Sequence, residues 1–119
     1  HPLSSKNSIS PDELLQYPFI IETPGCDNDI LHLLNTCAQK PRISYSFRDD
    51  SLIMAFVEKG LGITISQKLV TQAFPSSGID VRSLSPAYFR TIGLAFPQST
   101  NSVVFKIFLD YLKAHFFDM

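Results

Sequence analysis

The stretch at residues 49–66, DDSLIMAFVEKGLGITIS, decides the fold that we expect for this chain. Its two opening aspartates offer carboxylates to the free N–H groups that begin a helix, and the apolar run at 52–57 is typical of a helix buried on most sides. Gly60 stands where a helix ends in the left-handed conformation. Residues 63–65 then predict a short buried strand. The unit is a capped helix, a glycine stop and a strand.

Short apolar runs alternate with segments of helical periodicity along the rest of the chain. Ser10, Pro11 and Glu13 form a capping-box pattern that opens a short helix, and Pro18 ends it. Residues 1–9 are expected to form an extended, polar leading segment. The further expected strands are 19–21, 43–47, an edge strand through Ile79, Val81 and Leu84, and 91–96. In the strand at 43–47, the alternation predicts that Ile43, Tyr45 and Phe47 are half-buried. The further expected helices are 27–39 capped by Asp27 or Asn28, 67–73 capped by Ser66, and the aromatic stripe of 105–116. Alternating strands and helices predict an α/β fold, with a mostly parallel sheet and helices on both faces.

Composition narrows the class of protein. At 119 residues, 45% of them hydrophobic, the chain is expected to fold as one domain with a real core. Ten basic and eleven acidic side chains give a formal charge of −1 without a basic stripe, so this segment by itself is a poor candidate for binding nucleic acid. No apolar run approaches the ~20 residues that span a membrane. The start at His1, without a Met or a signal-peptide pattern, predicts a fragment of a longer protein.

The two cysteines, Cys26 and Cys37, are expected to be unbridged. If residues 27–39 are helical, the two lie roughly 15 Å apart along the axis, whereas a disulfide requires Cα atoms closer than about 7 Å. Cys37 is then an apolar residue on the inner face of the helix. This pattern predicts a reducing compartment, the cytoplasm.

Three loops follow the predicted strands at the sheet edge where open α/β sheets bind ligands. They span residues 22–28, 48–51 and 66–68. All three lead into helix N-termini, which favour an anion. Thr23 and Ser51 can donate hydroxyl hydrogen bonds, and Arg48 can pair with a carboxylate, so we predict a small polar or anionic effector at this rim. The structural alternative is that these polar residues only cap helices and form turns: Thr23, Asp27, Asp50 and Ser66.

The central stretch, with its V-x-x-G-L-G-I pattern from Val57 to Ile63, resembles the signature of the effector-binding domain of LysR-type transcriptional regulators. Residues 10–15 before 18–20 resemble that family's short helix leading into a strand. Residues 90–95 resemble its returning strand, and the Phe-rich end its final helix. The resemblance covers nearly the whole chain but only the second half of such a domain. It departs at Ser66, where many members carry proline, so the turn there is expected to differ.

The resemblance implies one subdomain of a type 2 periplasmic-binding-protein-like fold. Residues 1–97 would form the second regulatory subdomain, including the crossover strands, and 98–119 a C-terminal helix that returns to the absent first subdomain. Regulators of this type hold a small-molecule effector in a cleft between the subdomains and contact DNA through an upstream winged helix-turn-helix. The site residues implied by the resemblance are Thr23, Pro24 and Gly25, with Arg48 and Asp49.

Other functions fit the sequence less well. The leading interpretation is an effector-binding fragment of a cytoplasmic LysR-type regulator; the alternative is one lobe of a periplasmic solute-binding protein. A small α/β enzyme ranks last, because the adjacent Asp49 and Asp50 diverge on any regular backbone and the histidines show no metal-ligand spacing. No cofactor is predicted. The aromatic stripe of the last helix, which lacks its expected partner here, predicts self-association.

Overall fold

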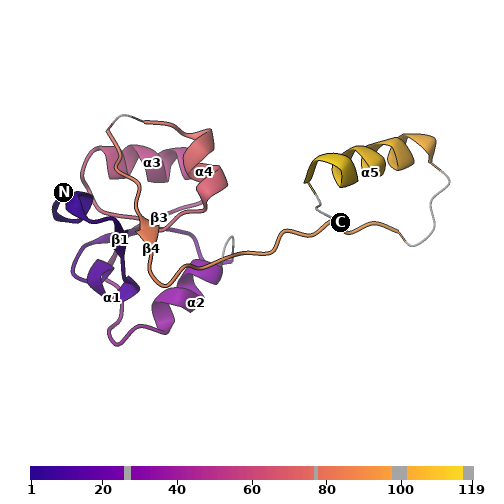
Figure 1. Ribbon diagram of the computed structural model, residues 1–119. Coiled ribbons are helices and arrows are strands. Elements are labelled where there is room, and N and C mark those ends of the chain that lie inside the picture. Colours follow the sequence, from indigo (N-terminus) through magenta and orange to yellow (C-terminus); the bar gives the residue numbers. More distant parts are fainter. Residues whose placement is uncertain (26–27, 77, 98–101, 117–119) are drawn as a thin grey trace. The chain divides into compact units, whose positions relative to one another are not determined.

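The computed structural model describes residues 1–25, 28–76, 78–97 and 102–116. The chain divides into two units, His1–Phe89 and Arg90–Met119 (Figure 1). Each unit is described by itself.

The main sheet of the first unit is parallel. Strand β2, Phe19–Glu22, pairs with β3, Ile43–Phe47, and the start of β2 also forms a single parallel bridge to Ile63. The helices are α1 (Pro11–Leu14), α2 (Asp29–Asn35), α3 (Asp50–Glu58) and α4 (Lys68–Ala73). Helices α1 and α2 lie on one side of the strands, and α3 and α4 lie on the other (Figure 1). The predicted α/β class, with parallel strands covered on both faces, is confirmed.

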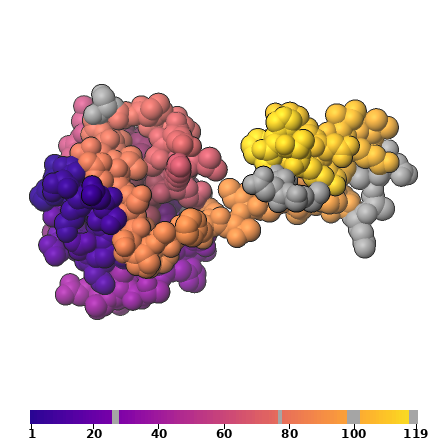
Figure 2. All heavy atoms as spheres, in the orientation of Figure 1, coloured from indigo at the N-terminus to yellow at the C-terminus, as the bar shows by residue number. Residues whose placement is uncertain are grey.

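A second pair of strands joins the beginning and the end of this unit. A 3-10 helix, Pro2–Ser5, leads to β1, Ser8–Ile9, which pairs in parallel with β4, Ser83–Leu84. The pairing brings the indigo and orange segments together on the surface (Figure 2). The expectation of an extended, polar segment at 1–9 was wrong, because its apolar side chains are part of the core. The edge strand expected through residues 79–84 forms only at its last two residues.

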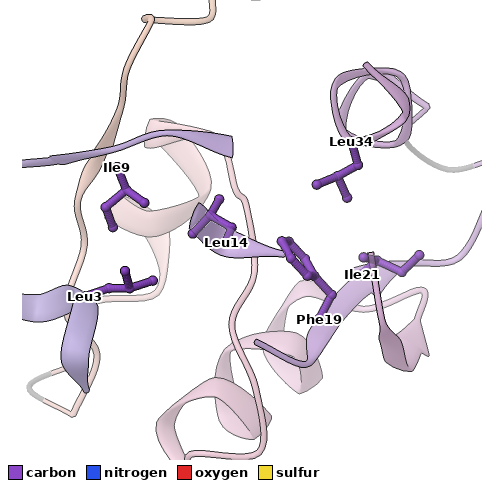
Figure 3. Packing of buried hydrophobic residues seen from close by; sticks show 6 residues of the cluster. All are labelled: Leu3, Ile9, Leu14, Phe19, Ile21 and Leu34. Atoms are coloured by element: carbon purple, nitrogen blue, oxygen red, sulfur yellow. The ribbon is translucent and has the colours of Figure 1, made fainter. Parts of the chain in front are cut away.

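The main hydrophobic cluster of the first unit lies between β2 and the helices α1 and α2. Phe19 and Leu34 are fully buried, and Ile21 stands beside them from the same face of β2 (Figure 3). Leu3 and Ile9 extend this cluster toward the N-terminal strand, with Leu14 of α1 between the two groups. The buried residues described in this cluster come from the first 34 positions, and Ile63, Ile65 and Leu84 pack against them partly buried.

The predicted capping box at α1 is present. The Glu13 carboxylate accepts hydrogen bonds from the backbone N–H of Ser10 at 2.9 Å and from the Ser10 hydroxyl at 3.0 Å. It also pairs with the Lys6 ammonium. The hydrogen bond from Lys6, and then those from Ser10, lower the pKa of Glu13 to about 2. This carboxylate fixes the start of the helix.

Helix α3 begins as predicted and is less buried than predicted. Gly60 has a φ of +72° after the end of α3, as the predicted glycine stop requires. Only Ile53 and Met54 of α3 are buried. The expected burial on most sides was wrong, because α3 packs on β2 and β3 with one face.

Several other predicted bounds need correction. Helix α2 ends at Asn35 and not at 39, so Cys37 lies beyond the helix and is half-buried. The expected strand at 63–65 is only the bridge at Ile63. Helix α4 begins at Lys68, and its N-cap position is Gln67 and not Ser66, because the Gln67 carbonyl accepts the first helical hydrogen bond, from Thr71. The predicted cap Asp27 lies outside the described residues.

The exposure of β3 also differs from the prediction. Ile43 is 46% and Tyr45 38% exposed, and only Phe47 is half-buried. Within the described residues β2 is the one strand that pairs with β3, so β3 has an open edge. The register shifts between Phe19 and Ile20, so the strict alternation predicted for β3 is broken near its start.

In the second unit, the predicted helix is confirmed and the predicted strand is not. Helix α5 spans Val103–Phe116, and its Phe105 ring lies 5.3 Å from the Phe96 ring, centroid to centroid. Residues 91–96 are exposed and form no strand, since no strand pairs with them in the described part of the chain. A strand requires such a partner for its backbone groups.

Candidate functional site

The carboxyl ends of β2 and β3 meet at one edge of the first unit. The parallel register places Glu22 beside Phe47, and the Thr23 N–H continues the ladder with a 2.8 Å hydrogen bond to the Phe47 carbonyl. Thr23 is therefore held at the last rung of the pair, and Arg48 is the next residue after β3. The structure brings the first two predicted loops to this edge, as parallel strands require.

The Thr23 hydroxyl has a partner on the neighbouring strand. Ser46 of β3 donates a hydrogen bond from its Oγ to the Thr23 Oγ1 over 3.3 Å. Sequence reasoning missed Ser46 as a site residue. The available signal was the alternation in β3, which places Ser46 on the face opposite to Tyr45 and Phe47, together with the expectation that β3 lies next to β2.

The turn after Thr23 is closed by its own side chains and backbone. Gly25 has a φ of +97°, which favours glycine, and its N–H donates to the Asn28 Oδ1 at 3.1 Å. Pro24 and Gly25 are both exposed. Asn28 takes the N-cap position of α2 without a side-chain bond into that helix. Pro24 and Gly25 thus shape the turn, and the Gly25 N–H is already used within it.

The second loop contains a helix cap and an exposed cation. The Asp49 carboxylate accepts from the Ser51 N–H at 2.8 Å and from the Ser51 hydroxyl at 2.6 Å. The Ser51 hydroxyl and then its N–H lower the pKa of Asp49. Both residues are therefore engaged in starting α3. Arg48 is exposed and has no carboxylate partner among the described residues.

The third loop is attached less firmly to the edge. Ser66 follows Ile63 by three residues, as Glu22 follows the bridged Phe19. Ser66 is half-buried, and its hydroxyl makes no hydrogen bond within the part of the chain that the structure describes. The structure thus joins Thr23, Ser46 and the Arg48 loop through the β2–β3 ladder, whereas the Ser66 hydroxyl forms no hydrogen bond with them among the described residues.

The described residues hold no constellation of metal ligands or nucleophiles. No group of three or more His, Cys, Asp or Glu side chains is placed to bind a metal within the described ranges. Cys37 is free, and burial, then the nearby Asp12 charge, raise the pKa of its thiol, which disfavours the reactive thiolate. Cys26 lies outside the described residues. Nor does any helix in the described ranges have the length and apolarity to cross a membrane.

Comparison with known proteins identifies the family. The model of the LysR substrate binding domain matches residues 1–117, almost the entire chain. No solved structure matches the chain significantly. The matched family comprises the effector-binding domains of LysR-type regulators, which are not enzymes and have the periplasmic-binding-protein-like fold. The predicted resemblance is confirmed, and this chain belongs to the LysR substrate-binding domain family.

Proposed function

We propose that this chain forms part of the ligand-sensing domain of a LysR-type regulator and binds a small, carboxylate-bearing effector at the ends of β2 and β3. The observation that carries this proposal is a pair of hydrogen-bond donors at adjacent strand ends. Among the described residues, the Thr23 hydroxyl has only the Ser46 hydroxyl as a partner, and the Arg48 guanidinium has no carboxylate partner. An effector carboxylate supplies both with an acceptor.

The charge for recognising an anion comes from Arg48 and not from helix α3. The Asp49 carboxylate already occupies the N-terminus of α3 and brings a negative charge there. A second anion at the same N–H groups would be repelled. Because the guanidinium presents a planar fork of donors, Arg48 suits a carboxylate better than a point charge would.

The regulatory mechanism follows from the position of the site at the edge of one subdomain. Residues 1–97 would supply one wall of the effector cleft, and 98–119 the helix that returns to a first regulatory subdomain. Effector binding would shift the population of subdomain arrangements and so alter DNA binding by an upstream winged helix-turn-helix in the cytoplasm. A net charge of −1 supports placing the DNA contacts outside this chain. Family membership supports this proposal over a periplasmic solute-binding lobe.

The last helix supports self-association of the isolated chain. Within α5 the exposed apolar side chains include Val104, Ile107, Phe108 and Phe116. Apolar surface of this kind is covered in a stable assembly, here by a second copy of the chain. Light scattering over rising protein concentration is expected to show a mass above that of the monomer. A monomeric mass at every concentration would contradict it.

Two site substitutions test the proposed effector site, with acetate as the probe for a carboxylate. In ¹⁵N-labelled protein at constant ionic strength, acetate is expected to shift the amide signals of Thr23 and Arg48 to saturation. Thr23→Ala should weaken acetate binding about threefold to tenfold, because it removes one hydrogen bond at the surface, of about 1 kcal/mol net. Arg48→Met should remove the preference for acetate over the uncharged acetamide.

Lys59→Met is the matched control, since it removes an exposed positive charge just beyond the opposite end of α3. It should leave acetate binding unchanged. If acetate shifts neither amide, or if both site variants bind acetate as the unaltered protein does, the proposed site is wrong.

A further inference from the structure

The hydroxyl groups of Thr23 and Ser46 form one unit across two strands. In the parallel ladder Ser46 pairs with Ile21, two residues before Thr23, and therefore lies on the same face of the sheet as both. The backbone bond from the Thr23 N–H to the Phe47 carbonyl, at 2.8 Å, fixes the spacing of the two strands at this point. The Ser46 Oγ then lies 3.3 Å from the Thr23 Oγ1.

A bound carboxylate would fix the direction of this hydrogen bond. A hydroxyl has one hydrogen to donate and two lone pairs that accept. When the Thr23 hydroxyl donates to a carboxylate, its oxygen still accepts from the Ser46 hydroxyl 3.3 Å away, so the two hydroxyls form a chain that ends at the ligand. An accepted bond also polarises the Thr23 hydroxyl and makes it a stronger donor. Because Thr23 is β-branched, its χ1 angle is already restricted. The hydrogen bond from Ser46 then restricts the rotation of the Thr23 hydroxyl hydrogen.

Other hydroxyls near this edge are arranged differently. Ser44 of the same strand is exposed, and its hydroxyl forms no hydrogen bond with the described residues. The Ser51 hydroxyl donates to Asp49 and belongs to the cap of α3. Of these three serine hydroxyls, the one that forms a hydrogen bond with Thr23 belongs to Ser46. At 3.3 Å the bond is longer than the usual O–H···O distance of about 2.7–2.8 Å, so its effect on binding should be modest.

We infer that Ser46 is a positioning residue of the effector site, which orients the Thr23 hydroxyl as a donor toward the bound ligand. This inference rests on the proposed function, since it assumes that Thr23 donates to an effector. Ser46 itself makes no contact with the ligand in this arrangement. Its removal should matter only while the Thr23 hydroxyl is present.

The test is a double-mutant cycle on acetate binding, measured by the amide shifts described above. Ser46→Ala is expected to raise the dissociation constant of acetate about twofold to fivefold. Ser46→Thr, which keeps the hydroxyl, should stay within about twofold of the unaltered protein. In a Thr23→Ala background, Ser46→Ala should have no further effect. Ser44→Ala, the matched control on the same strand, should bind acetate normally.

The outcomes separate this inference from the proposed function. If Thr23→Ala weakens acetate binding while Ser46→Ala does not, the positioning role is wrong and the effector site stands. An equal effect of Ser46→Ala with and without the Thr23 hydroxyl also overturns the positioning role, because Ser46 would then act by another route. If acetate binding does not depend on Thr23, the positioning role is wrong, and if it depends on neither Thr23 nor Arg48, the proposed function falls with it.

Discussion

Gly62 stands at the closest backbone approach in the central stretch, and its replacement by alanine tests that packing. A Cβ atom at Gly62 would lie 2.6 Å from the Pro18 carbonyl oxygen and 3.1 Å from the Ile20 Cγ1. The same carbonyl accepts the Ile63 N–H at 2.9 Å, so any shift that relieves the clash also lengthens this bond. Overpacking costs about 1–3 kcal/mol and the bond about 1 kcal/mol. Gly62→Ala should therefore lower the free energy of unfolding by about 2–4 kcal/mol.

Urea unfolding followed by far-UV circular dichroism measures this change, with two other glycines as references. Gly93→Ala meets no atom within 4 Å and should be neutral or slightly stabilising. Gly60→Ala is equally unobstructed but has a φ of +72°, so it should cost only the strain of that backbone, about 1–2 kcal/mol. If the free energy of unfolding of Gly62→Ala lies within about 0.5 kcal/mol of that of the unaltered protein, the close backbone approach at Gly62 does not constrain the fold.

Three further predictions concern the first unit, each measured by urea unfolding. Leu34→Ala should lower the free energy of unfolding by about 2–5 kcal/mol, because Leu34 is 0% exposed. Leu69 is 63% exposed, so Leu69→Ala should leave the free energy of unfolding nearly unchanged. Equal losses in the two variants would contradict the assignment of Leu34 to the core. The folded protein lowers the pKa of Glu13 from 4.5 to about 2, so the ionised carboxylate stabilises the fold above pH 4.5 and this stabilisation is lost as the pH falls through about 2. The difference in free energy of unfolding between the unaltered protein and Glu13→Gln should therefore shrink between pH 6 and pH 3. A constant difference would refute this. Arg82→Lys should lower the free energy of unfolding by about 1 kcal/mol, because the guanidinium donates hydrogen bonds from both Nε and Nη2 to the Ser4 carbonyl. An unchanged free energy of unfolding would show that these two hydrogen bonds do not stabilise the fold.

Local signals in the sequence predicted the elements whose stability is local. The capping box at Ser10 and Glu13, the Asp49 cap and the glycine stop at Gly60 all depend on residues within a few positions of one another. The strands β2 and β3 were also predictable, because short apolar runs between turn residues favour strands in any α/β chain. Their parallel pairing then followed from the order of the elements.

Elements that depend on distant partners were predicted less well. The strand expected at 91–96 has the composition of a strand but no strand beside it, and composition alone cannot supply one. Conversely, Leu3 and Ile9 are buried because β4 pairs with β1 from the far end of the unit, and the polar residues around them concealed this. Helix α2 ended early, at Asn35, although its apolar spacing continued to Ala38.

The candidate site shows the same division between local and distant information. Thr23 and Arg48 were predicted because each follows a strand, and the ends of parallel strands meet. Asp49 and Ser51 were also named as site residues, but they bond to each other as a helix cap. Ser46 was not named, since its contact with Thr23 arises from the register of β3 against β2, which the sequence does not specify residue by residue.

The single bridge at Ile63 also has a kinetic consequence. Two backbone hydrogen bonds, from Ile63 N–H to Pro18 and from Ile20 N–H to the Ile63 carbonyl, join this position to β2. So short an attachment can open while the β2–β3 ladder stays closed, which is a local opening of low free energy. The amide protons of Ile20 and Ile63 should accordingly share one protection factor against deuterium exchange, lower than that of the Thr23 amide proton. The third strand position is thus the first part of the sheet to detach.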